Sequence, residues 1–184
     1  QSLNDLQQAV TTVARRASNL TQFVDAYRSI ARLPEPKFKT LTAADFIERV
    51  RLLACQEWPQ KHIDIAISIE PSHLTFTADE HMLEQVLINL LNNAEHAVLE
   101  NPGERQVAIY AGVSQNGEVI LSIADNGPAV SEELVRQIFV PFFTTKPRGS
   151  GVGLSLSRQI LMLHGGRLSY RESDMGGACF DLYF

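Results

Sequence analysis

Asparagines interrupt an apolar stretch of the chain, where amide side chains are unusual. Asn89 and Asn93 are four positions apart in the run 86–94, so a helix would place both on one face. Buried amides are costly unless they form hydrogen bonds or hold an ion. An Asn carbonyl oxygen is a suitable ligand for Mg²⁺, which takes its other ligands from water and phosphates. By itself, the pair fits either a magnesium site or two amides satisfied by ordinary hydrogen bonds.

A carboxylate followed closely by a glycine ends another apolar stretch. Asp125, Asn126 and Gly127 come directly after the apolar residues 119–124. A carboxylate at the end of a buried strand can accept a hydrogen bond from an exocyclic amine such as that of adenine. The glycine allows the backbone to approach a flat ring. Asp-Asn-Gly is also a common turn sequence, so this motif alone predicts no more than a turn.

Alternating glycines at positions 149, 151 and 153 precede a segment with helical periodicity. At the start of a helix, such glycines leave backbone N–H groups free to face an anion. The motif is not a dinucleotide fingerprint, because no strand ends directly before it and no βαβ unit surrounds it. It is not a Walker loop either, because no Gly-Lys-Ser or Gly-Lys-Thr follows. Alone, it is a weak indication of phosphate binding.

About 20 residues lie between the last two motifs, and an irregular segment at 140–152 begins among them. A long irregular segment inside a compact domain is usually a functional lid or disordered. Aromatic side chains would anchor a lid, whereas hydroxyls and an ammonium group would reach phosphates; an ordinary surface loop is the alternative. The candidate side chains are Phe139, Phe142, Phe143, Thr144, Thr145 and Lys146.

The elements that must position these residues follow from the periodicity of the sequence. We expect helices at about 42–56, 79–99, 131–139 and 153–164, and strands at about 63–69, 74–77, 105–114, 118–124, 167–172 and 178–184. The first two strands are interpreted as a hairpin. Because helices and strands mix without regular βαβ alternation, we predict an α+β fold, a two-layer α/β sandwich with one mixed sheet and helices on one face.

Several local signals mark the ends of these elements. The stretch 42–45 resembles a capping box with Asp in place of Glu. Asn116 and Gly117 form a strong hairpin-turn signal. Gly165, which follows His164, predicts a left-handed cap at the end of a helix.

One long N-terminal helix is expected at 1–33, because apolar or small residues recur at alternating steps of three and four over 3–31. Prolines at 34 and 36 end the pattern. We interpret 34–44 as a linker and 45–184 as a globular domain. A single helix cannot bury its own apolar stripe, so this helix requires a partner helix; packing on its own domain is the alternative.

Composition limits the possible functions. The hydrophobic fraction of 45% and the charged fraction of 20% are typical of a soluble globular protein. A net charge of −5 without a Lys/Arg run argues against a nucleic-acid partner. Cys55 and Cys179 lie far apart and form no metal-ligand pattern, which favours a reducing cytoplasmic location.

No apolar run approaches the roughly 20 residues that cross a bilayer. Because neither an initiator Met nor a signal peptide begins the chain, we interpret it as part of a longer protein, and a membrane anchor in that parent stays open.

Taken together and in this order, the motifs resemble those of the sensor histidine kinase catalytic domain, in the Bergerat ATP-binding superfamily. The resemblance covers about 70–184. Residues 89–94 resemble the N box, Asp125 and Gly127 the G1 box, 141–146 the F box and 149–154 the G2 box. Their joint order favours an ATP site over each separate alternative. The resemblance implies the Bergerat fold, with ATP and Mg²⁺ as cofactors.

The resemblance also implies roles for single residues. Asn93 would coordinate Mg²⁺, Asn89 would help to hold the metal and phosphates, and Asp125 would bind the adenine amine, with Gly127 as a further cofactor-binding position. His96 stands where relatives often carry a basic or polar phosphate contact. Asn89, Asn93 and Lys146 would serve catalysis. The other cofactor-binding positions are Phe143, Thr144, Thr145, Lys146, Gly149, Gly151, Val152, Gly153 and Leu154. Ala178 is a departure, because relatives usually have a Thr there that helps to order water at adenine.

Position 89 discriminates among the possible activities. Hydrolysing members of the superfamily have a Glu there to activate water, whereas the amide of Asn89 cannot accept a proton. We therefore favour an ATP:protein-histidine phosphotransferase of a two-component system. The alternatives are an ATP-hydrolysing conformational switch, a protein-serine kinase of the same superfamily and a non-catalytic dimerisation module.

The N-terminal helix resembles the second helix of the dimerisation and phosphoacceptor hairpin of these kinases. None of the five histidines stands in the sequence context of the phosphorylated histidine. The resemblance therefore implies a fragment that lacks its acceptor. The implied partners are the phosphoacceptor helix of the same kinase, within a homodimer of the parent protein, and a response regulator.

Overall fold

The structure, a computed structural model, describes residues 7, 10, 11, 13, 24, 33–146 and 149–184. Most of the predicted N-terminal helix at 1–33 therefore lies outside the described residues. Within the described part of the chain, no helix is both long enough and apolar enough to cross a membrane.

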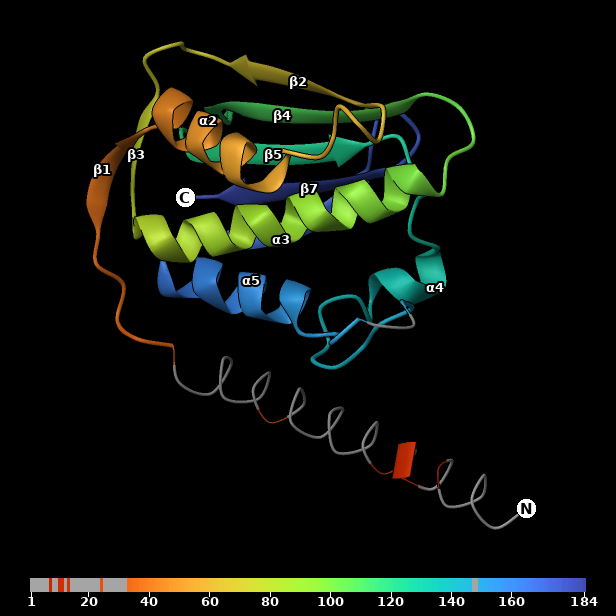
Figure 1. Ribbon diagram of the computed structural model, residues 1–184. Helices are drawn as coiled ribbons and strands as arrows, with labels where there is room; N and C mark the ends of the chain where they lie inside the picture. Colours follow the sequence, from red (N-terminus) through yellow and green to blue (C-terminus); the bar gives the residue numbers. More distant parts are fainter. Residues whose placement is uncertain (1–6, 8–9, 12, 14–23, 25–32, 147–148) are drawn as a thin grey trace.

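A mixed five-stranded sheet with helices on one face forms the body of the fold (Figure 1). The strand order is β2-β4-β5-β7-β6. Only the β2–β4 pair is parallel among these neighbours. The strands are β2 (Ile63–Ile69), β4 (Arg105–Val113), β5 (Val119–Asp125), β6 (Arg167–Glu172) and β7 (Ala178–Tyr183). The helices are α2 (Ala43–Ala54), α3 (Glu80–Leu99), α4 (Glu132–Val135) and α5 (Gly153–Leu163). The predicted two-layer α+β sandwich is confirmed.

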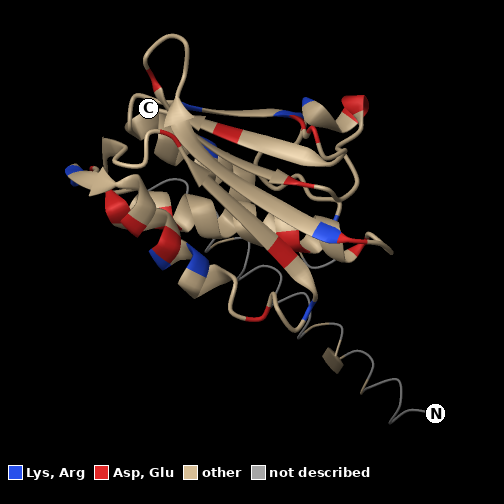
Figure 2. Cartoon of the chain, turned by 90° about the horizontal axis from the view of Figure 1, so that it is seen from above, with Lys and Arg blue, Asp and Glu red and all other residues tan. Residues whose placement is uncertain are grey.

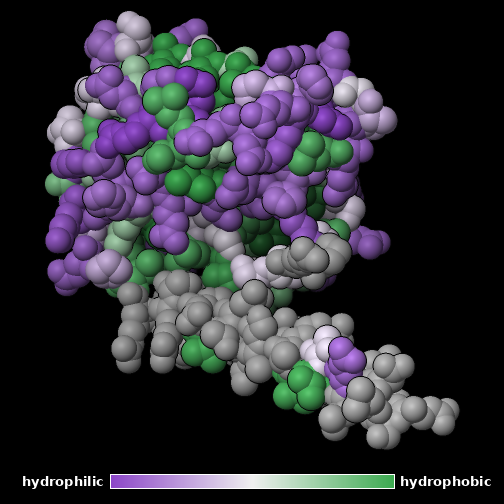
Figure 3. Space-filling model, viewed as in Figure 1, coloured by the Kyte–Doolittle hydropathy of each residue, from purple (hydrophilic) through white to green (hydrophobic). Residues whose placement is uncertain are grey.

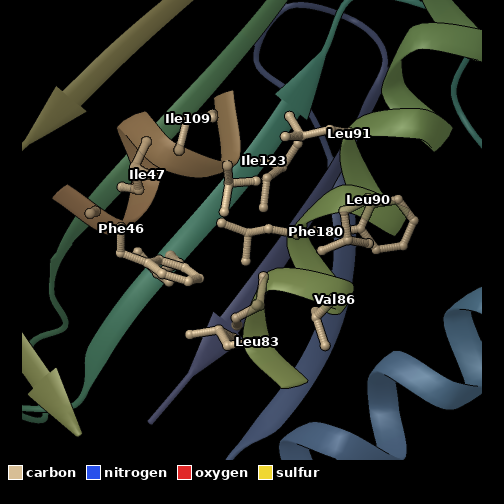
Figure 4. Close-up of a cluster of buried hydrophobic side chains, with 14 of the residues drawn as sticks. Phe46, Ile47, Leu83, Val86, Leu90, Leu91, Ile109, Ile123 and Phe180 are labelled. Atoms are coloured by element: carbon tan, nitrogen blue, oxygen red, sulfur yellow. The ribbon is translucent and has the colours of Figure 1, made fainter. Parts of the chain in front are cut away.

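The core lies between α3 and the sheet (Figure 4). Leu83, Leu90 and Leu91 of α3 are fully buried and face Ile109 of β4 and Ile123 of β5. Each such side chain contributes roughly 1.5–3 kcal/mol through burial. This packing fixes the rotation of α3 about its axis, and therefore the direction of its polar residues.

The hairpin predicted for 63–69 and 74–77 was wrong. Strand β3 (Thr75–Ala78) pairs antiparallel with β1 (Lys39–Thr42) in a separate two-stranded sheet, whereas β2 pairs with β4. The backbone N–H of Glu70 donates to the carbonyl oxygen of Ala111 at 2.8 Å, which extends the β2–β4 ladder to the end of β2. An alternating pattern indicates a strand and its buried face, but it does not select the partner strand.

The ends of the helices follow the predictions with two exceptions. Thr42 precedes α2 with an extended backbone, but its side chain makes no capping hydrogen bond, so the predicted capping box was wrong. The helix α4 is shorter than the predicted range 131–139. Gly165 has the predicted left-handed backbone, with φ of 74°, and Gly117 in the predicted hairpin turn has a φ of 82°. Asp79 caps α3 by accepting a 3.0 Å hydrogen bond from the N–H of Met82.

Residues 33–38 dock onto the ends of α3 and α5. The N–H of Lys37 donates to Oδ2 of Asp79 at 2.7 Å, and the ring of Phe38 meets that of His164 edge-to-face at 5.2 Å. Nε2 of His164 accepts a 2.9 Å hydrogen bond from the N–H of Asp79. The segment that we expected to be a linker is therefore held against the domain at this point, and its residues 39–42 form β1.

Basic and acidic residues are interspersed along the described part of the chain (Figure 2). In the face shown in Figure 3, hydrophilic residues dominate and apolar ones form separate patches. One carboxylate is buried among cations: Glu80, with 8% of its side chain exposed, bonds to Lys39 of β1 and Arg49 of α2. Because Glu80 is the first residue of α3, these two contacts join the small sheet and α2 to α3.

Candidate functional site

The side chains of Asn89 and Asn93 on α3 point toward α5 and Lys146, respectively. Nδ2 of Asn89 donates to Oγ of Ser157, on the second turn of α5, at 3.1 Å. Oδ1 of Asn93 accepts a 2.9 Å hydrogen bond from Nζ of Lys146. The spacing of four residues therefore places both amides on one face of α3, as predicted.

The start of α5 packs directly against Asn89. A Cβ atom added to Gly153 would lie 2.1 Å from Oδ1 of Asn89, so only glycine allows this approach. The first turn of a helix has N–H groups without helical partners, and its dipole favours an anion. The contact thus places a helix start, where the dipole favours an anion, beside the Asn89 amide.

A backbone hydrogen bond joins residues near the two ends of the irregular segment, which we call its base. The N–H of Phe142 donates to the carbonyl oxygen of Gly151 at 2.8 Å. Both residues have a positive φ of 68°. A Cβ on Gly151 would lie 2.4 Å from the carbonyl carbon of Phe142. Within the segment, Oγ1 of Thr144 accepts a 3.1 Å hydrogen bond from the N–H of Lys146. Positions 147–148 lie outside the described residues.

The aromatic ring of Phe139, just before the segment begins, contacts both the sheet and α5. The ring of Phe139 meets that of Phe180 on β7 edge-to-face at 6.5 Å. On α5, the guanidinium carbon of Arg158 lies 5.6 Å from the centre of the Phe139 ring. Phe139 therefore fastens the segment between the sheet and α5.

The oxygen of Asn93 already faces a cation in this structure. Burial lowers the pKa of Lys146, and the nearby Glu100 carboxylate opposes that change. Over the described residues, no cluster of three or more His, Cys, Asp or Glu side chains could hold a metal. A single amide oxygen fits Mg²⁺ only if phosphates and water supply the other ligands, which is how this ion is usually bound.

Asp125 ends β5 as a buried carboxylate, with 3% of its surface exposed. Its Oδ1 accepts hydrogen bonds from the N–H of Gly127 at 2.9 Å and of Ala178 at 3.3 Å. Burial raises the pKa of this carboxyl, and the two N–H groups partly oppose the rise. Both contacts use Oδ1, and within the described part of the chain neither involves Oδ2. A Cβ on Gly177 would lie 2.3 Å from Oδ1, which requires glycine there.

The remaining predicted residues show fewer contacts. His96 is exposed, with Nδ1 2.6 Å from the carbonyl oxygen of its own helix at Asn92. Thr145 is exposed and Phe143 is half-buried. Val152 is buried, whereas Leu154 is half-buried against the core.

Sequence reasoning missed two contributors, Ser157 and Gly177. The hydroxyl of Ser157 bonds to Asn89, and Gly177 lies against Asp125. Gly177 belongs to a Gly-Gly pair before a strand, a signal that could have marked a close approach. A serine in a helix carries no comparable signal.

Residues 78–184 match the family described as Histidine kinase-, DNA gyrase B-, and HSP90-like ATPase. The chain is 30% identical over 178 residues to the sensor histidine kinase ZraS of Klebsiella oxytoca, covering 96% of this chain and 37% of that protein. The catalytic domain of histidine kinase ThkA is similar in structure, with a TM-score of 0.72 and 32% identity, covering 80% of this chain and 95% of that one.

A second ThkA structure contains that kinase in complex with the response regulator TrrA. It matches with a TM-score of 0.76 and 27% identity, over 97% of this chain and 51% of that one. The chain spans about a third of the length of the curated relatives it matches, 37% and 34% for the first two.

Proposed function

The chain belongs to the family of histidine kinase-, DNA gyrase B- and HSP90-like ATPases, and we propose that it is the ATP-binding catalytic domain of a sensor histidine kinase. In this function it binds Mg-ATP and directs the γ-phosphoryl group to a histidine of a two-component system. The main support is the position of the two asparagines: Asn89 lies against Gly153 at the start of α5, and Asn93 accepts a hydrogen bond from Lys146. The division into a hairpin helix at 1–33, a linker at 34–44 and a catalytic domain at 45–184 is part of the proposal.

Adenine would bind at the end of β5. Oδ1 of Asp125 is occupied by the N–H groups of Gly127 and Ala178, which leaves Oδ2 to accept a hydrogen bond from the exocyclic amine. A buried carboxylate discriminates well, because a base without that donor would leave it unpaired. The base would therefore be selected by a hydrogen bond.

The phosphates would bind at the start of α5 and under the segment 140–152. The backbone N–H groups of 149–153 and the ammonium of Lys146 are the donors for them. Asn93 would hold Mg²⁺ through Oδ1, with Asn89 supporting the same cluster. When bound, Mg²⁺ neutralises charge on the transferred phosphoryl group. The residues of the chain would position the nucleotide and exclude other geometries.

The amide at position 89 favours transfer over hydrolysis. Asn89 donates from Nδ2 to Ser157, and its other atom is a carbonyl oxygen that cannot remove a proton from water. A neutral imidazole is already a nucleophile, so a histidine acceptor needs no such base. This difference supports a kinase rather than an ATP-hydrolysing switch.

The acceptor and partners are proposed from the relatives. His164 is engaged in capping, with Nδ1 2.7 Å from the carbonyl oxygen of Ile160 and Nε2 bonded to Asp79. We place the acceptor histidine on the other helix of the same kinase, within a homodimer, and a response regulator downstream, as in the ThkA complex with TrrA. A cytoplasmic location fits the use of ATP and the two free cysteines.

Phosphotransfer to a separate acceptor tests this function. The chain is mixed with labelled ATP, Mg²⁺ and a protein that carries a histidine-kinase phosphoacceptor helix. An acid-labile, base-stable label on the acceptor is expected, and it should be absent when the acceptor histidine is replaced by glutamine. Tight ATP binding without transfer to any acceptor tried would contradict a kinase. Steady phosphate release by the chain alone would support hydrolysis instead.

A further inference from the structure

We propose that Asn126 is a positioning residue that fixes the Asp125 carboxylate relative to α3 and thereby sets selectivity for adenine. The inference rests on the proposed function, because it concerns the base that Asp125 would bind. In the sequence, Asn126 is merely the middle residue of a turn motif. In the structure, its side chain and backbone join two segments of the chain.

The amide of Asn126 bonds to the start of β4 and to the connection that precedes it. Its Oδ1 accepts a hydrogen bond from the N–H of Gln106 at 2.8 Å, and its Nδ2 donates to the carbonyl oxygen of Glu104 at 2.8 Å. Its backbone is tied to the same place: the N–H donates to the carbonyl oxygen of Gln106 at 3.1 Å, and the carbonyl oxygen accepts from Nδ2 of Asn101 at 3.0 Å.

These bonds differ from those of an ordinary turn asparagine. In common turns, an Asn side chain bonds to backbone within about two residues of itself. The partners of Asn126 lie 20 to 25 positions away in sequence. The Asn126 amide therefore joins segments that are far apart in sequence, which the formation of a turn does not require.

The consequence for Asp125 follows from the residues on either side. Gly127, which donates to Oδ1 of Asp125, packs so closely on α3 that an added Cβ would lie 2.6 Å from the carbonyl carbon of Ala97. Ala97 is one turn beyond Asn93 on the same helix. Asn126 thus holds the turn against the end of α3 and fixes the Asp125 carboxylate relative to Asn93. Without this fastening, the turn could shift, and the carboxylate would no longer meet the adenine amine at hydrogen-bond distance.

The test compares two nucleotides that differ at that amine. Binding of Mg-ADP and Mg-IDP, whose base has a carbonyl in place of the exocyclic amine, is measured by calorimetry on the 184-residue chain. We expect the unchanged chain to prefer ADP by about tenfold or more, the size of a hydrogen bond to a charged group. Asn126→Ala should reduce that preference to about threefold or less while IDP affinity stays nearly constant.

The matched control is Asn116→Ala, in the Asn-Gly pair at the other end of β5, which should keep the full preference. Asn126→Asp gives a second measurement if the alanine variant folds poorly, because it keeps the acceptor for Gln106 and loses the donor to Glu104. A preference that stays unchanged in the folded Asn126 variants overturns the inference, as does an equal loss for both nucleotides, which indicates a purely structural role. If the unchanged chain did not bind ADP, the result would contradict the proposed function, and this inference would fail with it.

Discussion

The ammonium of Lys146 donates a 2.9 Å hydrogen bond to Oδ1 of Asn93, the atom that we propose as a metal ligand. A Mg²⁺ ion and an ammonium group held in contact with one oxygen repel each other strongly. Binding of Mg²⁺ at Asn93 would therefore require Lys146 to move, and the phosphates offer it a new partner. Lys146 would in this way respond to the metal.

Replacing Asn93 should remove the magnesium dependence of nucleotide binding. We expect Asn93→Ala to lower Mg-ATP affinity at least about tenfold, the scale on which metal sites respond to a lost partner. ADP affinity in the presence of a chelator should change much less. Calorimetry with and without Mg²⁺ measures both. Asn92→Ala is the matched control, because Asn92 is the exposed neighbour on the same helix. Equal losses with and without metal would contradict the metal role.

Asp125→Asn should weaken adenine binding without destabilising the fold. The raised pKa of Asp125 means that the folded chain holds its proton more tightly than the unfolded chain does. Ionisation above that pKa therefore costs stability, and a neutral amide avoids this cost. We expect ADP affinity to fall about tenfold or more, while the melting temperature stays equal or rises.

The pH dependence of the unchanged chain gives an independent check on Asp125. Acidification toward its raised pKa should protonate the carboxyl and weaken ADP binding at a higher pH than an ordinary aspartate would. The Asn variant should lack this effect. Asp64→Asn, on the exposed side of β2, serves as the control. A lower melting temperature with unchanged ADP binding would refute the assignment.

Gly151→Ala should disturb the base of the segment 140–152. A φ of 68° costs an alanine roughly 1–2 kcal/mol, and its Cβ would lie 2.4 Å from the backbone of Phe142. We expect nucleotide affinity to fall severalfold. Gly103→Ala is matched, because its Cβ would meet only Oδ1 of Asn101, at 3.8 Å. Equal nucleotide affinity in the two variants would show that the Phe142–Gly151 contact does not shape the site.

Sequence reasoning predicted much of this fold because strong local signals agreed. The apolar residues of α3 recur at helical spacing, and the same spacing placed Asn89 and Asn93 on one face. The glycines at 117 and 165 adopt the backbone that their turn signals indicated. Helix ends and tight turns depend on neighbouring residues, so a single sequence contains most of the required information.

The misses concern contacts between residues far apart in the chain. β1 pairs with β3 across more than thirty positions, from Lys39 with Ala78 to Thr42 with Thr75, and nothing in a four-residue strand names its partner. The bond from Asn89 to Ser157 depends on how α3 and α5 pack. From the sequence, Asn126 was interpreted as a turn residue. Its contact with the carbonyl oxygen of Glu104, which belongs to another loop, could not be predicted from the local pattern. Such contacts are set by tertiary packing, which local patterns do not encode.

The buried carboxylate of Glu80 should make the stability of this domain sensitive to acid. Hydrogen bonds from Lys39 lower its pKa, burial opposes this change, and Arg49 lowers the pKa further. A lowered pKa in the folded state means that the stabilisation is complete above the usual glutamate value of about 4.3 and is lost as the pH falls through the folded value. We therefore expect Glu80→Gln to unfold at lower denaturant concentration than the unchanged chain near neutral pH.

That difference should shrink as the pH falls from the usual glutamate value through the lowered folded value of Glu80, because below the folded value both side chains are uncharged. Denaturant unfolding across this range measures it. Glu118→Gln is the control: its pair with Arg167 has 54% of the arginine and 32% of the glutamate side chain exposed, and exposed pairs contribute little. A smaller change is expected there. If the Glu80→Gln difference persisted unchanged in acid, the ion pairs would not be its cause, and lost packing around the buried side chain would explain it instead.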